Sequence, residues 1–387
     1  MQYDVYNIKL SMGMTRIGYD LRWHTGTLVH YVGNLIRALA IQGKEEFQFV
    51  CYEDGTAGQI MAELDGVAEF HRVPWSRYSL GSQIFLPKLL RRDGIRLFHC
   101  PFYMMPFLSS CPTVVTIHDV IPFLKYSDKR GFDKMAICGL NWLAAHRASA
   151  IITVSELSKK DILRVLGVPE SKVKVAHCGM GSYVAVQPKP DLYSQFVPYF
   201  ACMTARHFEA KNTTLAIKAW RIFRERTGFP HRLLIGGGTT EEGRARLTEA
   251  IGGVEDCNLL GFVPDESFSS FLHSAEAFII PSLYEGFGLP ALEAMACGTP
   301  LLSSNRASLP EVGGDAALYF HAEDPEQLAN LMIRVATDPE LRTRMISQGK
   351  AQAQKFTYSE SARNILSLYR QLLGPSNSGA RGSHSKN

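Results

Sequence analysis

The sequence predicts an α/β protein made of two Rossmann-like, doubly wound domains that face a central cleft. Its 387 residues suggest two domains, because one domain usually has about 100–200 residues. Short apolar runs alternate with longer amphipathic stretches, which is typical of strand–helix–strand units in a parallel sheet. A proline-rich segment at 186–191 separates two series of such units and predicts domains at 14–187 and 192–357.

Apolar runs predict the strands of the first domain, and amphipathic runs predict its helices. The strand candidates are residues 15–19, 47–52, 95–99, 113–118 and 150–154. The helix candidates are residues 28–40, 141–148 and 156–166.

The second series repeats this order. Its strand candidates are residues 200–203, 233–235, 258–260, 277–280 and 300–303. Helices are expected at 213–226 and 290–296, and further helical stretches extend to about residue 373. Gly374 and Pro375 form a stop signal, and the polar segment 375–387 predicts a disordered tail.

Composition excludes several classes of protein. With 46% hydrophobic and 20% charged residues, the chain has ordinary globular values. Its eight cysteines are scattered without a C-x-x-C pair, which favours a reducing compartment. No apolar run approaches the about 18 residues of a membrane span, and the N-terminus lacks the apolar core of a signal peptide. We therefore expect a soluble, cytoplasmic protein.

The net charge of +4 is unevenly distributed. Residues 14–190 carry 21 Lys and Arg against 15 Asp and Glu, whereas residues 191–387 carry 19 against 21. The basic first half suggests an anionic partner. The imbalance is too weak to indicate nucleic acid, and no zinc-finger or aromatic–basic RNA motif supports one.

The most informative segment follows the strand candidate 277–280. Its loop contains two glycines, and Pro290 suits the first turn of the next helix. Backbone N–H groups at such a helix start bind anions, and glycine lets a phosphate approach them. Glu285 and Glu293 flank this start, so one carboxylate can bond sugar hydroxyls while the other reaches a ribose diol. The alternative for either residue alone is a solvated glutamate beside a capped helix.

Glu285 and Glu293 form an E-x7-E motif within E-G-F-G-L-P-A-L-E-A-M-A-C-G-T-P. This segment closely resembles the retaining glycosyltransferases of family four, which have the GT-B fold. G-F-V-P-D at 261–265 precedes it and L-P-E-V-G-G-D-A-A at 309–317 follows it, as in that family. The resemblance extends from about residue 15 to 373. It implies that the helix at 358–373 packs back on the first domain.

Arg206 and Lys211 lie between a strand and a helix. Cations there oppose the helix dipole, so an anionic ligand explains them better than solvent does. The resemblance implies that they bind the diphosphate of a nucleotide sugar. It also implies donor contacts for the following residues: Gly26, Phe262, Val263, Phe287, Gly288, Leu289 and Glu293.

His118 ends a buried strand, at the edge of a parallel sheet where ligands bind. The resemblance implies that His118 and Glu285 grip the transferred sugar from opposite domains. Asp119 either orients His118 or caps the next turn. Relatives carry G-I-G-R-Y in the first strand–helix loop, whereas this chain has one glycine, Gly26, and His30 in place of the arginine. This departure leaves the acceptor contact open.

The sequence gives little support for a dinucleotide cofactor or a metal ion. The glycines at 236–238 follow a strand, but a dinucleotide fingerprint would need glycine where the chain has Glu241. No P-loop, D-x-D triplet, H-E-x-x-H or Cys/His cluster occurs, so we predict a metal-independent enzyme without a cofactor. Family-type retention uses same-face attack with help from the leaving phosphate, and no protein nucleophile is evident.

Residues 82–92 are amphipathic. Phe85, Leu86, Leu89 and Leu90 are predicted on one face, with Lys88, Arg91 and Arg92 on another. An ordinary surface helix is one interpretation. Docking on an anionic membrane is the other, because many relatives use lipid-linked acceptors.

The segment V-T-I-H-D-V-I-P-F at 115–123 resembles mannosyl- and rhamnosyltransferases of surface polysaccharide assembly. We therefore expect transfer of a hexose, with GDP-mannose as the favoured donor, to a glycan or lipid-linked acceptor in polysaccharide or lipopolysaccharide biosynthesis. The enzyme would be cytoplasmic, with peripheral contact at the inner face of the membrane. The alternatives are a UDP-sugar-dependent glucosyl- or N-acetylglucosaminyltransferase, an epimerase or phosphorylase of the same fold, and a non-catalytic sugar-nucleotide-binding subunit.

Overall fold

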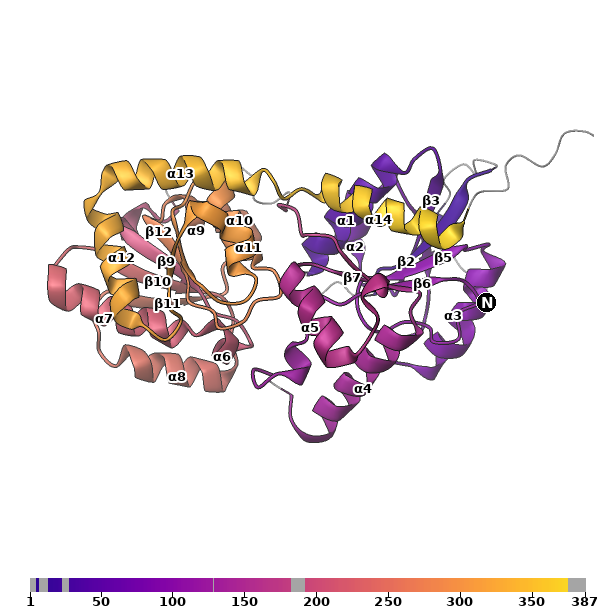
Figure 1. The fold of residues 1–387 in the computed structure, drawn as a ribbon, viewed down its shortest axis with the longest axis horizontal. Coiled ribbons are helices and arrows are strands. Elements are labelled where there is room, and N and C mark those ends of the chain that lie inside the picture. Colours follow the sequence, from indigo (N-terminus) through magenta and orange to yellow (C-terminus); the bar gives the residue numbers. More distant parts are fainter. Residues whose placement is uncertain (1–4, 7–12, 23–27, 128, 182–191, 375–387) are drawn as a thin grey trace, which may run out of the picture.

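The computed structural model describes residues 5–6, 13–22, 28–127, 129–181 and 192–374. It contains two α/β domains side by side, the first in indigo to magenta and the second in pink to orange (Figure 1). This arrangement confirms the predicted fold class of two Rossmann-like domains. Gly26, the whole linker at 186–191 and the tail at 375–387 lie outside the described residues.

The first domain is built on a sheet with the order β1-β4-β3-β2-β5-β6-β7-β8, in which all pairs except β1–β4 are parallel. Its strands are β1 (Val5–Tyr6), β2 (Thr15–Asp20), β3 (Phe47–Glu53), β4 (Glu69–Arg72), β5 (Leu97–Cys100), β6 (Thr113–Thr116), β7 (Ala150–Thr153) and β8 (Val173–Val175). Its helices are α1 (Leu28–Gln42), α2 (Gly58–Glu63), α3 (Leu80–Arg92), α4 (Gly131–Arg147) and α5 (Glu156–Leu166).

The second domain has an all-parallel sheet with the order β11-β10-β9-β12-β13-β14. Its strands are β9 (Tyr199–Met203), β10 (Arg232–Gly236), β11 (Cys257–Gly261), β12 (Ala277–Ile280), β13 (Leu301–Ser304) and β14 (Ala317–Phe320). Its helices are α6 (Phe208–Lys211), α7 (Thr213–Thr227), α8 (Glu241–Ile251), α9 (Asp265–His273), α10 (Leu289–Ala296), α11 (Leu309–Gly313), α12 (Pro325–Thr337) and α13 (Pro339–Ala353).

Strand order changes direction once in the middle of each sheet. The change lies between β2 and β5 in the first domain and between β9 and β12 in the second. Loops at the carboxyl ends of such strands diverge and leave room for a ligand. The fold therefore marks the loops after β9 and β12 as the place to look for a site.

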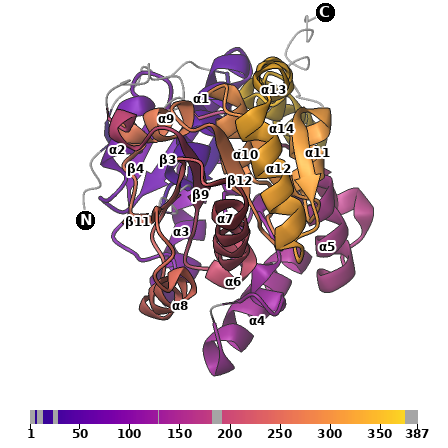
Figure 2. The same cartoon turned by 90° about the vertical axis from the view of Figure 1, so that its left-hand side faces the viewer.

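The last helix, α14 (Tyr358–Leu373), returns to the first domain and packs on α1. Both views place α13 and α14 along one edge of the molecule, where the chain passes from one domain to the other (Figure 2). The Tyr369 hydroxyl lies 2.6 Å from Nδ1 of His99, and Arg370 pairs with Glu46. Residues of α14 and of both sheets belong to one continuous hydrophobic cluster.

Several expected elements were wrong or missing. Residues 317–320 form strand β14 in a stretch expected to be helical, because four residues are too few to show a strand period and pairing with β13 supplies the hydrogen bonds. The short strands β4 and β8 were not predicted for the same reason. Helix α4 begins ten residues before the predicted start at residue 141.

The predicted faces of α3 need one correction. Leu86, Leu89 and Leu90 are buried as expected, but Phe85 is 46% exposed. Its ring stacks on Trp75 with centroids 5.3 Å apart, and Lys88 Nζ lies 5.7 Å from its centre. Phe85 therefore lies at the edge of the buried face and packs on the indole of Trp75 instead of on the hydrophobic core.

Candidate functional site

The loops after β9 and β12 carry three of the predicted residues and bring two of them, Lys211 and Glu285, into contact. Arg206 and Lys211 follow β9, and Glu285 follows β12. Lys211 Nζ donates to Glu285 Oε1 over 2.7 Å, and the Ser282 hydroxyl donates to the same oxygen over 2.7 Å. The other oxygen, Oε2, has no hydrogen-bond partner among the described residues. A carboxylate held on one side is thus available to a ligand on the other.

Asn212 explains why Lys211 meets Glu285. It ends the single turn α6 in the left-handed conformation with φ 52°, which asparagine tolerates. Its side-chain amide donates to the carbonyls of Pro281 (3.0 Å) and Ala322 (2.8 Å). The N–H of Leu283 donates to Ala210 O over 2.7 Å. These bonds join the β9 and β12 loops directly.

Arg206 is placed differently from Lys211. Its side chain is exposed at the loop after β9, and it has no acidic partner in the part of the chain that the structure describes. It keeps its hydrogen-bond donors for a ligand, whereas Lys211 uses one of its three donors on Glu285.

The start of α10 provides an anion-binding backbone. Gly288 has φ 100°, a conformation that favours glycine, and Leu289 begins the helix. Within the described residues, the N–H groups of Phe287, Gly288 and Leu289 donate to no other group. The Ser308 hydroxyl holds the loop from behind, 2.9 Å from Glu285 O and 2.7 Å from Phe287 O.

Glu293 lies one turn inside α10 and is 3% exposed. Burial raises the pKa of its carboxyl to about 8, so the ligand-free protein holds it neutral at pH 7. A neutral carboxyl both donates and accepts hydrogen bonds.

His118 follows β6 in the first domain. Its Nε2 lies 3.1 Å from the carbonyl of Pro101, so this nitrogen carries the hydrogen and Nδ1 is left as an acceptor. Burial lowers the pKa of His118 to about 4, and the ring is therefore neutral at physiological pH. Tyr31 packs edge-on against it with centroids 4.8 Å apart.

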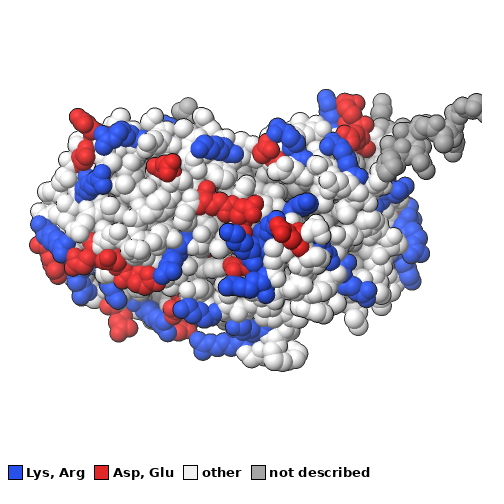
Figure 3. Space-filling model, in the orientation of Figure 1, with Lys and Arg blue, Asp and Glu red and all other residues white. Residues whose placement is uncertain are grey.

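The two groups of residues meet at the domain boundary. A Cβ added to Gly286 would lie 2.9 Å from His118 O and 3.1 Å from Asp119 Cβ, so no larger residue fits there. Asp119 accepts from the N–H of Ile121, and burial together with nearby Glu285 raises the pKa of its carboxyl. Charged side chains of both signs gather where the lobes meet (Figure 3). The structure thus places His118 beside the loop that carries Glu285.

Other predicted residues lie at the margin. Val263 is buried, whereas Phe262 is 75% exposed. Beside them, Asp265 meets His30 of the first domain, with 2.8 Å between Oδ2 and Nε2. His30 stands where the family has arginine, and it now forms a contact between domains.

Sequence reasoning missed further contacts across the boundary. The hydroxyls of Ser155 and Ser158 lie 2.6 and 3.0 Å from Gly286 O. The Tyr284 hydroxyl donates to Asp161 Oδ2 over 2.9 Å. The backbone N–H of Glu156 donates to Glu311. The only sequence signal for these contacts was a pair of serines. Ser155 directly follows the predicted strand 150–154, and Ser158 lies three residues later, in the first turn of the predicted helix 156–166.

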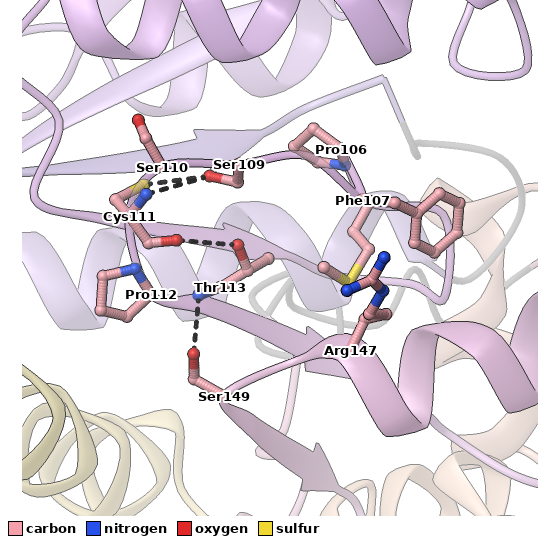
Figure 4. Close-up of a pocket in the computed structure, with 10 residues that line it drawn as sticks. Pro106, Phe107, Ser109, Ser110, Cys111, Pro112, Thr113, Arg147 and Ser149 are labelled. Carbon is pink, nitrogen blue, oxygen red and sulfur yellow. Dashed lines mark hydrogen bonds between the residues drawn. The ribbon is translucent and has the colours of Figure 1, made fainter.

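A separate pocket of about 250 Å³ lies at the opposite edge of the first sheet. It is lined by the turn before β6, by Arg147 at the end of α4 and by Ser149 before β7 (Figure 4). It contains none of the predicted site residues, and it faces the amino ends of the strands.

In the described ranges, no group of three or more His, Cys, Asp or Glu side chains could hold a metal ion. No helix found there is long and apolar enough to cross a bilayer.

Comparison with known proteins gives matches to both domains. Residues 28–180 match the family model described as Glycosyltransferase Family 4, and residues 196–352 match Glycosyl transferases group 1. O-antigen chain mannosyltransferase B of Escherichia coli is 28% identical over 293 residues, which cover 71% of this chain and 74% of that protein. The serotype-specific mannosyltransferase WbdA of Escherichia coli is 28% identical over 278 residues, which cover 67% of this chain but only 34% of WbdA.

Among solved structures, sucrose-phosphate synthase from Thermosynechococcus elongatus has a similar fold. Its TM-score is 0.70 at 20% identity, and the match covers 92% of this chain and 99% of that one. At this identity the likeness concerns the fold.

Proposed function

Since this chain is a family 4-like glycosyltransferase of the GT-B fold, we propose that it transfers mannose from GDP-mannose to a glycan or lipid-linked acceptor, with retention of configuration and without a metal ion. The observation that carries this proposal is the Lys211–Glu285 pair at the carboxyl ends of β9 and β12, beside His118 of the other domain.

The proposed donor site uses charges from the second domain. Arg206, Lys211 and the N–H groups of residues 287–289 would bind the diphosphate and stabilise its charge as the sugar leaves. Glu293 would bind the ribose, and residues 262–263 would border the base. In the first domain, residue 26 would approach the diphosphate or the acceptor.

The proposed sugar site lies at the domain boundary. Glu285 Oε2 and His118 Nδ1 are both acceptors, and sugar hydroxyls are donors. The leaving phosphate would accept the acceptor's proton, so neither side chain is needed as a nucleophile. Enclosure between the domains would limit hydrolysis.

Mannose is favoured by the relatives, since two of them are named as mannosyltransferases. These names give the sugar and not the base, so the test includes both guanine and uracil nucleotide sugars. UDP-glucose and UDP-N-acetylglucosamine are the competing donors.

Calorimetry with a panel of nucleotide sugars in EDTA tests the donor, followed by detection of the transferred hexose by mass spectrometry. We expect GDP-mannose to bind in the micromolar range and to be turned over in EDTA. Preferential binding of a UDP sugar would contradict GDP-mannose as the donor and would assign that UDP sugar instead. Binding without turnover for any acceptor would support a non-catalytic subunit, and loss of activity in EDTA would contradict metal independence.

Glu285→Gln tests the site itself. We expect transfer to fall at least about 100-fold, because a charge-assisted contact to the sugar and to Lys211 is lost. Glu276→Gln is a matched control. Glu276 is 15% exposed and pairs with His231 and Arg342, but it precedes β12 at the opposite edge of the sheet. Equal losses in the two variants would contradict the assigned role.

A further inference from the structure

The first turn of α5 connects the two halves of the site. It belongs to the first domain and starts at Glu156, directly after β7. Ser155 caps it by accepting from the N–H of Ser158 over 3.0 Å. Both serines are fully buried at the domain boundary.

Ser158 contacts both halves at once. Its hydroxyl lies 2.9 Å from the carbonyl of His118 and 3.0 Å from the carbonyl of Gly286. The first carbonyl belongs to the proposed sugar contact of the first domain. The second lies next to Glu285 in the second domain. One hydroxyl, which shares its single hydrogen between two acceptors, therefore bridges the two peptide groups that carry or flank these side chains.

Other groups of α5 hold the same arrangement. The Ser155 hydroxyl donates to Gly286 O over 2.6 Å. The N–H of Glu156 lies 3.0 and 3.1 Å from the two carboxylate oxygens of Glu311, which also bonds His177 Nε2 over 2.7 Å. A carboxylate at a helix N-terminus is stabilised by the unpaired N–H groups and by the helix dipole.

The charge on Glu311 is maintained under working conditions. Burial opposes its ionisation, but the hydrogen bond from His177 and the backbone N–H of Glu156 outweigh it and lower the pKa of the carboxyl. The side chain comes from α11 of the second domain, so the N-terminus of α5 is capped across the boundary.

We propose that the first turn of α5 is the positioning element of the enzyme: Ser158, supported by Ser155 and Glu311, sets the distance between His118 and Glu285. This inference rests on the proposed function for the identity of the sugar contacts. Displacing a reacting group by about 1 Å can cost on the order of 100-fold in rate, so small changes here should affect turnover.

Ser158→Ala is the main test, with Thr299→Val as its matched control. Thr299 is 2% exposed, and its hydroxyl donates to the carbonyl of Leu272 over 2.8 Å within the second domain, away from the boundary. Each variant removes one buried hydroxyl from a carbonyl. We expect Ser158→Ala to lower kcat at least about 10-fold while the donor Kd changes less than about twofold. Thr299→Val should lose comparable thermal stability and keep its kcat.

A pair of variants at Glu311 covers the case in which Ser158→Ala does not fold. Glu311→Gln keeps an oxygen that accepts from the Glu156 N–H, whereas Glu311→Ala removes it. The glutamine variant should retain most of the kcat and the alanine variant should not. Wild-type kcat in both Ser158→Ala and Glu311→Ala, or an equal loss in Thr299→Val, would overturn the proposal.

Hydrogen–deuterium exchange separates this inference from the proposed function. In Ser158→Ala and Glu311→Ala, peptides spanning residues 281–289 should exchange faster than in the wild type, and in Thr299→Val they should not. If the wild type transferred no hexose, the proposed function would be rejected. The exchange measurement would still show whether Ser158 and Glu311 hold the loop at 281–289 in place. Unchanged exchange would overturn the inference.

Discussion

At the scale of single residues, burial changes what identical side chains do. Glu285 and Glu293 are eight positions apart and chemically the same, yet they differ in environment. Glu285 is held by Lys211 and Ser282 at the domain boundary, whereas Glu293 is almost fully buried and has a raised pKa of about 8. The two carboxyls therefore offer a ligand different groups: Glu285 Oε2 accepts hydrogen bonds, whereas the protonated carboxyl of Glu293 can also donate one.

Glu293 makes stability depend on pH in a defined direction. Its pKa is raised from an ordinary 4.5 to about 8 in the fold, so its favourable contribution is complete below about pH 4.5 and is lost as the pH rises through 8. Each pKa unit corresponds to about 1.4 kcal/mol, so the loss is on the order of a few kcal/mol. The variant Glu293→Gln cannot ionise, so it should lack this loss of stability at high pH. We expect the melting temperature of the variant relative to wild type to increase from pH 5 to pH 8 and then level off. A constant difference across this range would contradict the buried, protonated state.

At the scale of elements, α3 carries exposed apolar side chains beside basic ones. Leu80, Ile84 and Phe85 are 79%, 49% and 46% exposed, and Lys88 lies against Phe85. An amphipathic helix with this composition suits the surface of an anionic bilayer, where apolar groups insert and cations remain among the headgroups. We propose this helix as the membrane contact of the enzyme.

Vesicle sedimentation tests this element. With vesicles of phosphatidylglycerol and phosphatidylcholine, Leu80→Ser/Phe85→Ser should reduce binding about tenfold or more, and salt should weaken wild-type binding by screening. Phe132→Ser/Met135→Ser on α4 is a matched control, because these side chains are 79% and 68% exposed on another helix. Loss of binding in the α4 variant alone would assign the contact to α4 and reject α3.

At the scale of the whole molecule, α14 ties the end of the chain to the start. Its Tyr369 reaches His99 in the core of the first domain, and Nε2 of His99 lies 2.9 Å from the Thr116 hydroxyl. Burial lowers the pKa of His99 to about 3, so the ring is neutral, and each of its two nitrogens has a hydroxyl partner. The second half of the chain thus completes the core of the first.

Neighbouring variants on α14 separate buried from surface contacts. Tyr369→Phe leaves Nδ1 of His99 buried without its hydroxyl partner and should cost about 1–3 kcal/mol. Arg370→Ala breaks an ion pair with Glu46 whose side chains are 47% and 48% exposed, and it should cost less than about 1 kcal/mol. Chemical denaturation measures both. A larger loss for Arg370→Ala would show that the surface pair, rather than the buried hydroxyl, holds α14.

The sequence by itself determined most of the secondary structure, and it supplied the candidate residues on which the proposed site is built. The helix at 156–166 and the strand at 277–280 were predicted with their observed bounds, because capping, periodicity and strand length are local properties. The spacing of Glu285 and Glu293 carried the predicted resemblance to family four for the same reason, since a loop and one helix start contain the whole pattern.

Only the tertiary structure decided burial and contacts between domains. Ser155 and Gly286 are 131 positions apart, and no local pattern relates them. The raised pKa of Glu293, the exposed position of Phe85 and the pairing that turns residues 317–320 into β14 also depend on distant neighbours. Hydrogen bonding along the chain fixes elements, whereas desolvation and packing depend on which elements meet, and that is settled only when the two sheets and α14 have assembled.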